Sequence, residues 1–231
     1  MNSAIIVAAG KGTRMGPDVD KLFLEVAGAP VILHTWKVFE EASCIDHLVL
    51  VVRAGMEKAF MDLASAAGFK KPFTLVPGGL ERQDSVWNGC AALPAGTEIV
   101  AVQDGARPCT TESLLRATIE AARDTGAAVA AQRVVDTIKE SADGEFIHQH
   151  LDRSKLFSVQ TPQTFRVDVL RKALAHARES GLLLTDDTAA CQMIGQPVKL
   201  VFSPRPNPKV TTSDDLPGID LLLRKLAGSR Q

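Results

Sequence analysis

The sequence lacks the features of a membrane, secreted or nucleic-acid-binding protein. None of its runs approaches the roughly 20 apolar residues that span a bilayer, and its first residues have neither the basic region nor the apolar stretch of a signal peptide. Its formal net charge of −1 provides no basic surface of the kind that recruits a nucleic acid or an anionic membrane. We therefore expect a cytoplasmic protein without a nucleic-acid or membrane partner.

Cysteine is scarce, and its spacing excludes the common cysteine-based sites. The sequence has no CxxC pair and no Cys/His spacing suited to zinc. A chain of 231 residues can bury a substantial core without disulfides or a structural metal. We interpret the four cysteines as buried free thiols; they are Cys44, Cys90, Cys109 and Cys191.

Short β-branched runs alternate with longer segments of helical period along most of the chain. Strands are expected at residues 5–8, 47–52, 73–76, 99–102, 127–131 and 198–202. Helices are expected at residues 31–42, 56–67, 85–93, 111–125, 167–180 and 186–194, with one more near the C-terminus. Because the strands are almost continuously apolar and helices separate them, the pattern predicts an α/β fold: a Rossmann-like, mostly parallel sheet covered by helices on both faces.

The alternation of expected strands and helices stops after Ala131. The segment at about 133–158 has little helical periodicity and contains the turn sequence ADG between two strand-like stretches, VVDTIKE and EFIHQHL. We interpret it as an inserted β-arm, either a flap or an extension that reaches a partner subunit. The sequence has no internal repeat, linker or low-complexity tract, so we expect a single domain over residues 1–231 that carries this arm.

The glycine-rich stretch AAGKGTRMG follows the first expected strand. Glycines there let backbone N–H groups approach phosphate oxygens, because no Cβ stands in the way. The dinucleotide-binding fingerprint GxGxxG does not match, since Gly10, Gly12 and Gly16 are spaced by two and four residues. The Walker A pattern does not match either. An NAD-dependent oxidoreductase is therefore disfavoured.

Two basic residues accompany this loop. Arg14 offers a planar donor fork suited to phosphate oxygens, and Lys21, seven residues later, offers a compact point charge. Together they favour an anionic ligand that contains phosphate. The alternative is that both side chains are solvated on a glycine-rich surface loop.

A longer series of motifs resembles one known family over essentially the whole chain. The motifs are VAAGKGTRMG, DKLFLEVAGAPVILHT, GGLERQDSVWNG, VQDGARP, DT at Asp136, DRSKL, QTPQTF, LTDD and NPKVTTSDDL. Their order and spacing resemble those of the 2-C-methyl-D-erythritol 4-phosphate cytidylyltransferases. The resemblance implies a nucleotidyltransferase fold and the transfer of a cytidylyl group from CTP to a sugar-alcohol phosphate, with release of pyrophosphate.

The resemblance also implies which residues hold the nucleotide. Three basic residues are implied as catalytic: Arg14, Lys21 and Lys209. Contacts to the nucleotide are implied for Ala8, Ala9, Gly10, Gly12, Gly79 and Ser85. On residue type alone, Gly79 could belong to a simple turn, Ser85 could be a helix N-cap, and Lys209 could be solvated in its proline-rich loop. Pro208 departs from the family, which usually has an apolar residue before this lysine.

Asp104 follows an expected strand at the carboxyl end of the sheet, where ligands bind in folds of this kind. Mg²⁺ takes few carboxylates alongside substrate phosphates and water, so Asp104 is a candidate ligand for Mg²⁺ or another divalent cation. The alternative is a surface ion pair between Asp104 and Arg107. By resemblance, the acceptor is bound by Arg107, Thr137, Arg153, Thr185 and Asp186. In the family the arm crosses to the other subunit, which implies a homodimer.

Two other functions stay open on the sequence alone. A cytidylyltransferase for ribitol phosphate or another pentitol phosphate would share the nucleotide motifs and much of the arm. A nucleotide-binding regulatory protein without catalysis is the second alternative. The joint presence of Arg14, Lys21, Asp104 and Lys209 argues against it, because binding alone has less need to concentrate charge at the α-phosphorus.

Overall fold

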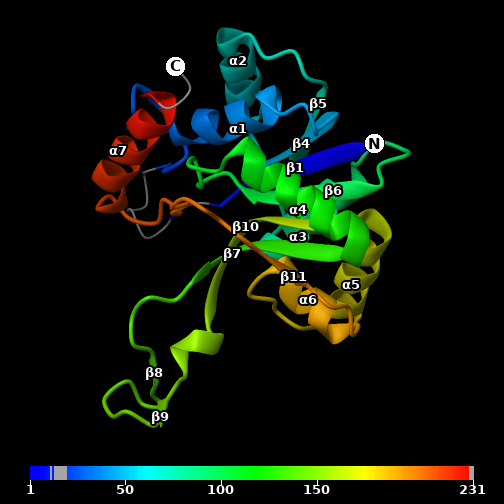
Figure 1. The fold of residues 1–231 in the computed structure, drawn as a ribbon. Coiled ribbons are helices and arrows are strands. Elements are labelled where there is room, and N and C mark those ends of the chain that lie inside the picture. The colour runs from blue at the N-terminus through cyan, green and yellow to red at the C-terminus, as the bar shows by residue number, and fades with distance from the viewer. Residues whose placement is uncertain (11, 13–19, 229–231) are drawn as a thin grey trace.

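The protein is built on a seven-stranded sheet with the strand order β11-β7-β10-β6-β1-β4-β5 (Figure 1). A computed structural model describes residues 1–10, 12 and 20–228. β10 runs antiparallel to its neighbours β6 and β7, and the other neighbouring pairs are parallel. The strands of this sheet are β1 (Asn2–Ala8), β4 (His47–Val52), β5 (Phe73–Pro77), β6 (Ile99–Asp104), β7 (Ala127–Arg133), β10 (Phe157–Arg166) and β11 (Lys199–Phe202).

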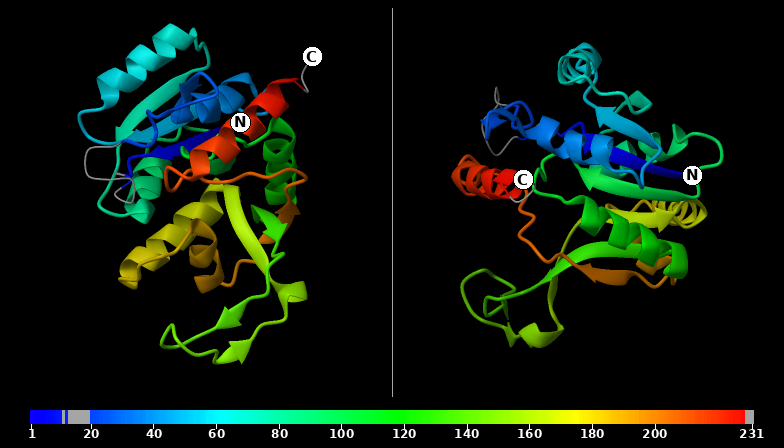
Figure 2. Two further views of the ribbon diagram at one scale, coloured as in Figure 1. Left: turned by 90° about the vertical axis from the view of Figure 1, so that its left-hand side faces the viewer. Right: turned by 45° about the horizontal axis from the view of Figure 1, so that its top comes forward.

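Helices cover both faces of the sheet, as the sequence predicts (Figure 1, Figure 2). Successive residues of a strand point to opposite faces, so Ile5 and Val49 join one apolar layer while Ile6 and Leu50 join the other. The first layer packs against α3 (Arg82–Ala91), α5 (Val167–Glu179) and α6 (Asp187–Met193). The second packs against α1 (Val31–Glu41), α2 (Glu57–Ala67), α4 (Glu112–Thr125) and α7 (Asp215–Gly228). The hairpin of β2 (Glu25–Val26) and β3 (Ala29–Pro30) precedes α1.

The segment between β7 and β10 projects from the body of the protein in all three views (Figure 1, Figure 2). It contains a small antiparallel pair, β8 (Lys139–Glu140) with β9 (Gln149–His150), whose residues are exposed. A 3₁₀ turn, Arg153–Lys155, leads back to β10. Its expected role in reaching a second subunit stays a prediction.

The central strand β10 has no counterpart among the expected elements. Its sequence FSVQTPQTFR is rich in polar residues and contains a proline, so it does not have the apolar pattern of a buried strand. The structure buries Gln163 and Thr164 all the same. Thr164 donates a hydrogen bond to the hydroxyl of Thr118 on α4 at 2.9 Å. Hydrogen bonds of this kind make the burial of polar strand residues tolerable.

The cysteines behave as expected, with one partial exception. All four are free thiols; Cys90, Cys109 and Cys191 are buried, whereas Cys44 is half-buried. Burial raises the pKa of Cys109 to about 11, so this thiol is protonated and unreactive at neutral pH. Among the helices of the described residues, none has the length and apolar character needed to cross a membrane.

Gly89 lies where α3 comes closest to the sheet. A Cβ at this position would be 2.7 Å from Ile5 Cγ2 and 3.0 Å from Val51 Cγ2. Because neither contact can open without moving β1 or β4, we expect Gly89→Ala to lower the free energy of unfolding by about 1–3 kcal/mol. Denaturant unfolding monitored by circular dichroism measures this.

The matched control for this prediction is Gly218→Ala in α7. Gly218 is exposed in a helix, and a Cβ there would meet nothing within 4 Å. Alanine at such a position should stabilise by roughly 0.5–1 kcal/mol. Equal unfolding free energies for the two variants would mean that α3 is free to move away from the sheet.

Candidate active site

A cavity of about 240 Å³ opens at the carboxyl end of β6. This is the end of a parallel sheet at which ligands bind. Charged side chains from four separate parts of the chain converge on it, from the starts of α3 and α6, the end of β6 and the loop before α7. The charged residues that line it are Arg82, Asp104, Arg107, Asp186 and Lys209.

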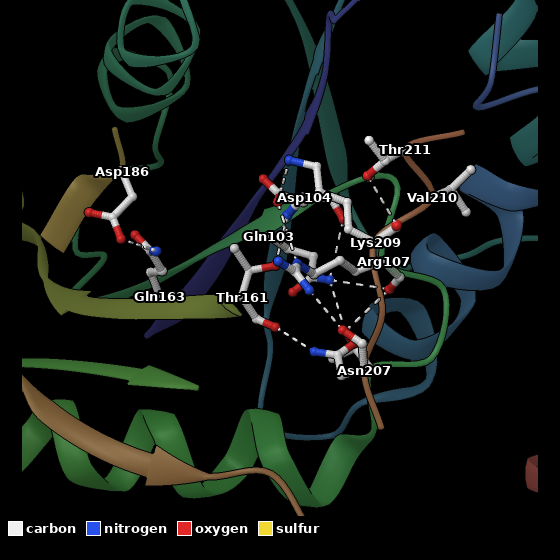
Figure 3. Close-up of polar contacts among 12 residues, drawn as sticks. Gln103, Asp104, Arg107, Thr161, Gln163, Asp186, Asn207, Lys209, Val210 and Thr211 are labelled. Carbon is white, nitrogen blue, oxygen red and sulfur yellow. Dashed lines mark hydrogen bonds and ion pairs between the residues drawn. The ribbon is translucent and has the colours of Figure 1, made fainter. Parts of the chain in front are cut away.

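Asp104 is the centre of this cluster (Figure 3). It is the last residue of β6 and is only 7% exposed. Its Oδ2 lies 2.9 Å from Lys209 Nζ and 3.5 Å from Arg107 Nε, and its Oδ1 lies 3.3 Å from Arg82 Nε. The ion pair considered for Asp104 and Arg107 is therefore present, but it is not a surface pair, because this carboxylate is buried and has two further cationic neighbours.

The cations decide the charge state of Asp104. Burial alone would raise the pKa of this carboxyl group, because desolvation disfavours the charged form. Arg82, Lys209 and Arg107 outweigh that effect and hold the pKa well below its usual range. Asp104 is therefore ionised at neutral pH and keeps the three cations close together at the cavity.

The loop that carries Lys209 is fixed by Asn207, whose residue surface is 1% exposed. Asn207 donates from Nδ2 to the carbonyl oxygen of Thr161 at 2.8 Å, and its Oδ1 accepts from the Thr110 hydroxyl at 3.1 Å. Its carbonyl oxygen accepts from Arg107 Nη1 at 2.7 Å. Asn207 therefore ties the lysine loop both to β10 and to the loop that follows β6 (Figure 3).

Lys21 reaches the same region from the N-terminal part of the chain. Its Nζ donates to the carbonyl oxygen of Val210 at 2.9 Å, directly after Lys209. Val210 in turn donates its N–H to the carbonyl oxygen of Ala106 at 2.8 Å. The structure thus brings together two of the three lysine and arginine residues expected to be catalytic. The third, Arg14, lies outside the described residues.

The expected nucleotide residues form a second group of close contacts. β1 ends at Ala8, and a Cβ at Gly78 would lie 2.2 Å from Ala9 Cβ, so the loop after β1 touches the loop after β5. Ser85 accepts a hydrogen bond from the Gly79 N–H at 3.1 Å. Gly10 follows in the same loop, and Gly12 adopts a left-handed φ of 64°.

Ser85 is not a helix N-cap, contrary to the alternative reading of its motif. α3 begins at Arg82, and its N-cap residue is Glu81. The Glu81 N–H donates to the carboxylate of Asp84 at 3.2 Å, so the helix is capped before Ser85 is reached. The Ser85 hydroxyl instead donates to the carbonyl oxygen of Glu81 at 3.2 Å.

The residues expected to bind the acceptor fall into two groups. Arg107, Thr185 and Asp186 line the cavity. The carboxylate of Asp186 caps α6, with Oδ1 accepting from the Ala189 N–H at 2.9 Å. Thr137 and Arg153 are exposed on the projecting segment, where Arg153 Nη1 donates to the carbonyl oxygen of Val135 at 2.7 Å. Neither of them is among the residues that line this cavity.

Asp104 is a candidate to hold a magnesium ion at the cavity. Within the described residues no three or more His, Cys, Asp or Glu side chains gather as a metal cluster. The protein would therefore supply few ligands, with Asp104 among them, and phosphate and water oxygens would supply the others. Mg²⁺ commonly binds in this manner, through one or two carboxylates and substrate phosphates.

Arg82, Asn207 and Gly78 belong to this region but were not identified from the sequence. All three lie inside or beside motifs that carried the resemblance, GGLERQDSVWNG and NPKVTTSDDL. Nothing in the local sequence around Arg82 distinguishes it from a solvated arginine. Its importance follows from its partners, which lie 22 and 105 residues further along the chain.

Comparison with known proteins agrees with this geometry. The model of the 2-C-methyl-D-erythritol 4-phosphate cytidylyltransferase family matches residues 2–225. The chain belongs to this family. Two relatives that carry the family's name come from Alkaliphilus oremlandii, at 42% identity over 93% of this chain and 91% of the relative, and from Geobacillus kaustophilus, at 44% identity over 92% of each chain.

Solved structures give the same family. The 4-diphosphocytidyl-2C-methyl-D-erythritol synthase of Anaerococcus prevotii has a TM-score of 0.86 and 29% identity over 96% of each chain. The 2-C-methyl-D-erythritol 4-phosphate cytidylyltransferase of Thermus thermophilus has a TM-score of 0.79 and 31% identity over 97% of this chain and all of that one. The resemblance seen in the sequence is therefore confirmed, as are the mostly parallel sheet and the cytidylyltransferase class of enzyme.

Asn207 provides a test of how the site is held. Asn207→Ala removes two side-chain hydrogen bonds and leaves buried groups on Thr161 and Thr110 without these partners. We expect the free energy of unfolding to fall by about 1–3 kcal/mol. We also expect kcat to fall, because Asn207 holds the loop that positions Lys209 at the cavity.

The control for this prediction is Gln196→Ala. The Gln196 side chain also makes two hydrogen bonds, both donated by its amide to backbone carbonyl oxygens, but these bonds are exposed. Its loss should cost less than about 1 kcal/mol and leave kcat unchanged. Equal effects on stability in the two variants would show that the burial of Asn207 does not matter.

Proposed function

We propose that this protein transfers the cytidylyl group of CTP to 2-C-methyl-D-erythritol 4-phosphate in isoprenoid biosynthesis. The products are 4-diphosphocytidyl-2-C-methyl-D-erythritol and pyrophosphate. One structural observation supports the proposal most directly: a buried carboxylate at the carboxyl end of β6 gathers three cationic side chains at a cavity. Membership of the cytidylyltransferase family supplies the identity of the two substrates.

The chemistry requires charge and position more than a protein nucleophile. An oxygen of the acceptor phosphate is ionised at neutral pH and attacks the α-phosphorus of CTP directly. A new P–O bond forms as the bond to the bridging oxygen breaks, and that oxygen leaves with pyrophosphate. Lys21 and Lys209 stabilise the negative charge that develops around the α-phosphorus, as Arg14 would. Arg107 orients the acceptor phosphate.

Magnesium belongs to this proposal as a partner of Asp104. When bound, it would offset part of the negative charge of the CTP phosphates. Asp104 is ionised and adjoins the cavity, and the cations around it have phosphate oxygens as an alternative partner. If Lys209 and Arg107 moved from the Asp104 carboxylate to phosphate oxygens, Asp104 Oδ2 would become available to the metal.

We further propose a homodimer in which the projecting segment completes the site of the partner. Thr137 and Arg153 do not line the cavity of their own chain. Val135, Phe146 and Ile147 on this segment are 78%, 72% and 68% exposed, and such large apolar side chains favour contact with another protein surface. The segment thus has both the apolar surface of an interface and two polar residues expected at the acceptor.

The free thiols fit a cytoplasmic enzyme. All four cysteines are unpaired, as is usual in the reducing cytoplasm, whereas secreted proteins commonly pair them. We therefore propose the cytoplasm as the site of the reaction. CTP is available there as a substrate.

The proposed reaction predicts substrate-dependent release of pyrophosphate. With CTP and Mg²⁺, the protein should turn over 2-C-methyl-D-erythritol 4-phosphate but not ribitol 5-phosphate. Lys209→Ala should lower kcat by roughly 10²-fold with a smaller change in CTP affinity, because the ammonium acts mainly on the transition state. Lys199→Ala on the exposed end of β11 is the control. Turnover of ribitol phosphate alone would contradict the proposed acceptor and would indicate a pentitol-phosphate cytidylyltransferase.

The proposed dimer predicts complementation between two inactive variants. Arg153→Ala changes the projecting segment, and Lys209→Ala changes the cavity. In a mixed dimer, one site therefore combines the intact cavity of the Arg153→Ala subunit with the intact segment of the Lys209→Ala subunit. After subunits are exchanged in an equimolar mixture, activity should rise to about one quarter of the wild-type value. A mixture of Lys21→Ala and Lys209→Ala should stay inactive, because both changes affect the body. No recovery in the first mixture would contradict the exchange of segments.

A further inference from the structure

Arg82 joins two acidic residues from different elements. It is the first residue of α3, and its guanidinium lines the cavity. Its Nε lies 3.3 Å from Asp104 Oδ1 on β6, and its Nη1 lies 2.8 Å from Asp187 Oδ2. Asp187 is the first residue of α6, and its side chain is 1% exposed. One guanidinium therefore links the end of a central strand to the starts of two helices.

Arg82 differs from the other two cations around Asp104. Lys209 and Arg107 both approach Oδ2, whereas Arg82 approaches Oδ1. Within the described part of the chain, it is also the only one of the three that has an ion pair with a second carboxylate. A planar fork of donors allows this, because its N–H groups point in fixed, separate directions.

Asp187 holds Arg82 in place. Among the described residues, Arg82 is the only one in an ion pair with Asp187, and the second oxygen of this carboxylate is buried without a hydrogen-bond partner. Burial raises the pKa of the Asp187 carboxyl group, and the Arg82 guanidinium opposes this effect. Moving the guanidinium away would therefore leave Asp187 with an uncompensated buried charge or force its protonation, and both are unfavourable. Arg82 is therefore less able than Lys209 to turn toward an incoming phosphate chain.

The chain of ion pairs from Asp104 through Arg82 to Asp187, called the link below, has a position that suggests its role in the reaction. α3 begins directly after the loop of Gly79, and α6 begins directly after Thr185 and Asp186. The link therefore spans the expected nucleotide side and the expected acceptor side of the cavity. It also fixes one oxygen of Asp104 and leaves the other toward Lys209 and Arg107.

We propose that Arg82, anchored by Asp187, is a positioning residue for cytidylyl transfer. It stays on Asp104 Oδ1 when the substrate phosphates draw Lys209 and Arg107 away from Oδ2. It thereby keeps the carboxylate oriented and holds α3 and α6 in register around the reacting groups. This inference rests on the proposed function, since it assigns Arg82 a part in that reaction.

The first test compares single variants by kcat and by CTP affinity. Arg82→Gln and Asp187→Asn should each lower kcat by about 10-fold or more, because misplaced groups react slowly. The Kd of CTP, measured by calorimetry without acceptor, should change by less than about threefold, since the link acts on geometry in the transition state. Arg82→Lys should recover only part of kcat, because one ammonium does not reproduce the two-sided fork. Arg116→Gln, which breaks an exposed ion pair with Glu112, is the control.

The second test separates positioning from folding. Single variants leave a buried charge unpaired and can lose stability for that reason alone. The double variant Arg82→Gln/Asp187→Asn removes both charges of this ion pair, so no unpaired charge remains at Asp187, and Lys209 and Arg107 still face Asp104. Its melting temperature should lie above that of Arg82→Gln alone, whereas its kcat should stay about 10-fold or more below that of the wild type.

The outcomes distinguish this inference from the proposed function. If the wild-type protein releases no pyrophosphate with either acceptor, the proposed function fails. If the wild type is active and the double variant retains kcat within about threefold of it, Arg82 has only a structural role and the inference is overturned. A folded double variant with low kcat and unchanged CTP affinity supports it.

Discussion

The buried negative charge of Asp104 is the constraint on which the site depends. A carboxylate in this position would be costly without compensation, and it is compensated by cations from three different loops or helix starts. The same attraction that stabilises the charge brings Arg82, Arg107 and Lys209 to one place. Lys209 and Arg107 are thereby held beside the cavity before substrate phosphates arrive.

The sheet makes this arrangement possible by fixing the end of β6. Gly105, directly after Asp104, donates its N–H to the carbonyl oxygen of Val7 at 2.9 Å. A Cβ at Gly105 would lie 3.0 Å from that oxygen and 2.9 Å from Ile32 Cδ1, so the chain passes very close to β1 and α1. Thr35 on α1 donates to the carbonyl oxygen of Gly105 at 2.8 Å. The loop that contains Arg107 therefore leaves the sheet in a defined direction.

The two lysine-bearing segments are connected through backbone atoms. Lys21 donates to the Val210 carbonyl oxygen, and the Val210 N–H donates to Ala106. Asp215, at the start of α7, accepts from the N–H groups of Thr211 and Thr212 at 2.7 and 2.9 Å. The lysine loop is thus held on one side by the end of β6 and on the other by the last helix. Residues far apart in the sequence act as one site because these short contacts limit their movement.

The apolar periodicity of the chain was enough to predict the layers of the fold, and its motifs named candidate residues that the structure places around the cavity. Apolar runs such as residues 47–52 specify buried parallel strands, and residue type alone makes Lys21 a candidate for phosphate and Asp104 a candidate for a divalent cation. Lys209 was singled out only by the resemblance of its motif to the family. The place of β10 could not be predicted in this way, because its buried side chains are polar and their partners come from α4 and from the first residue and N-cap of α6. The same holds for the link from Arg82 to Asp187, which are separated by 105 residues. Local patterns encode backbone preference and burial, whereas an ion pair between distant residues depends on which strands and helices the fold sets side by side.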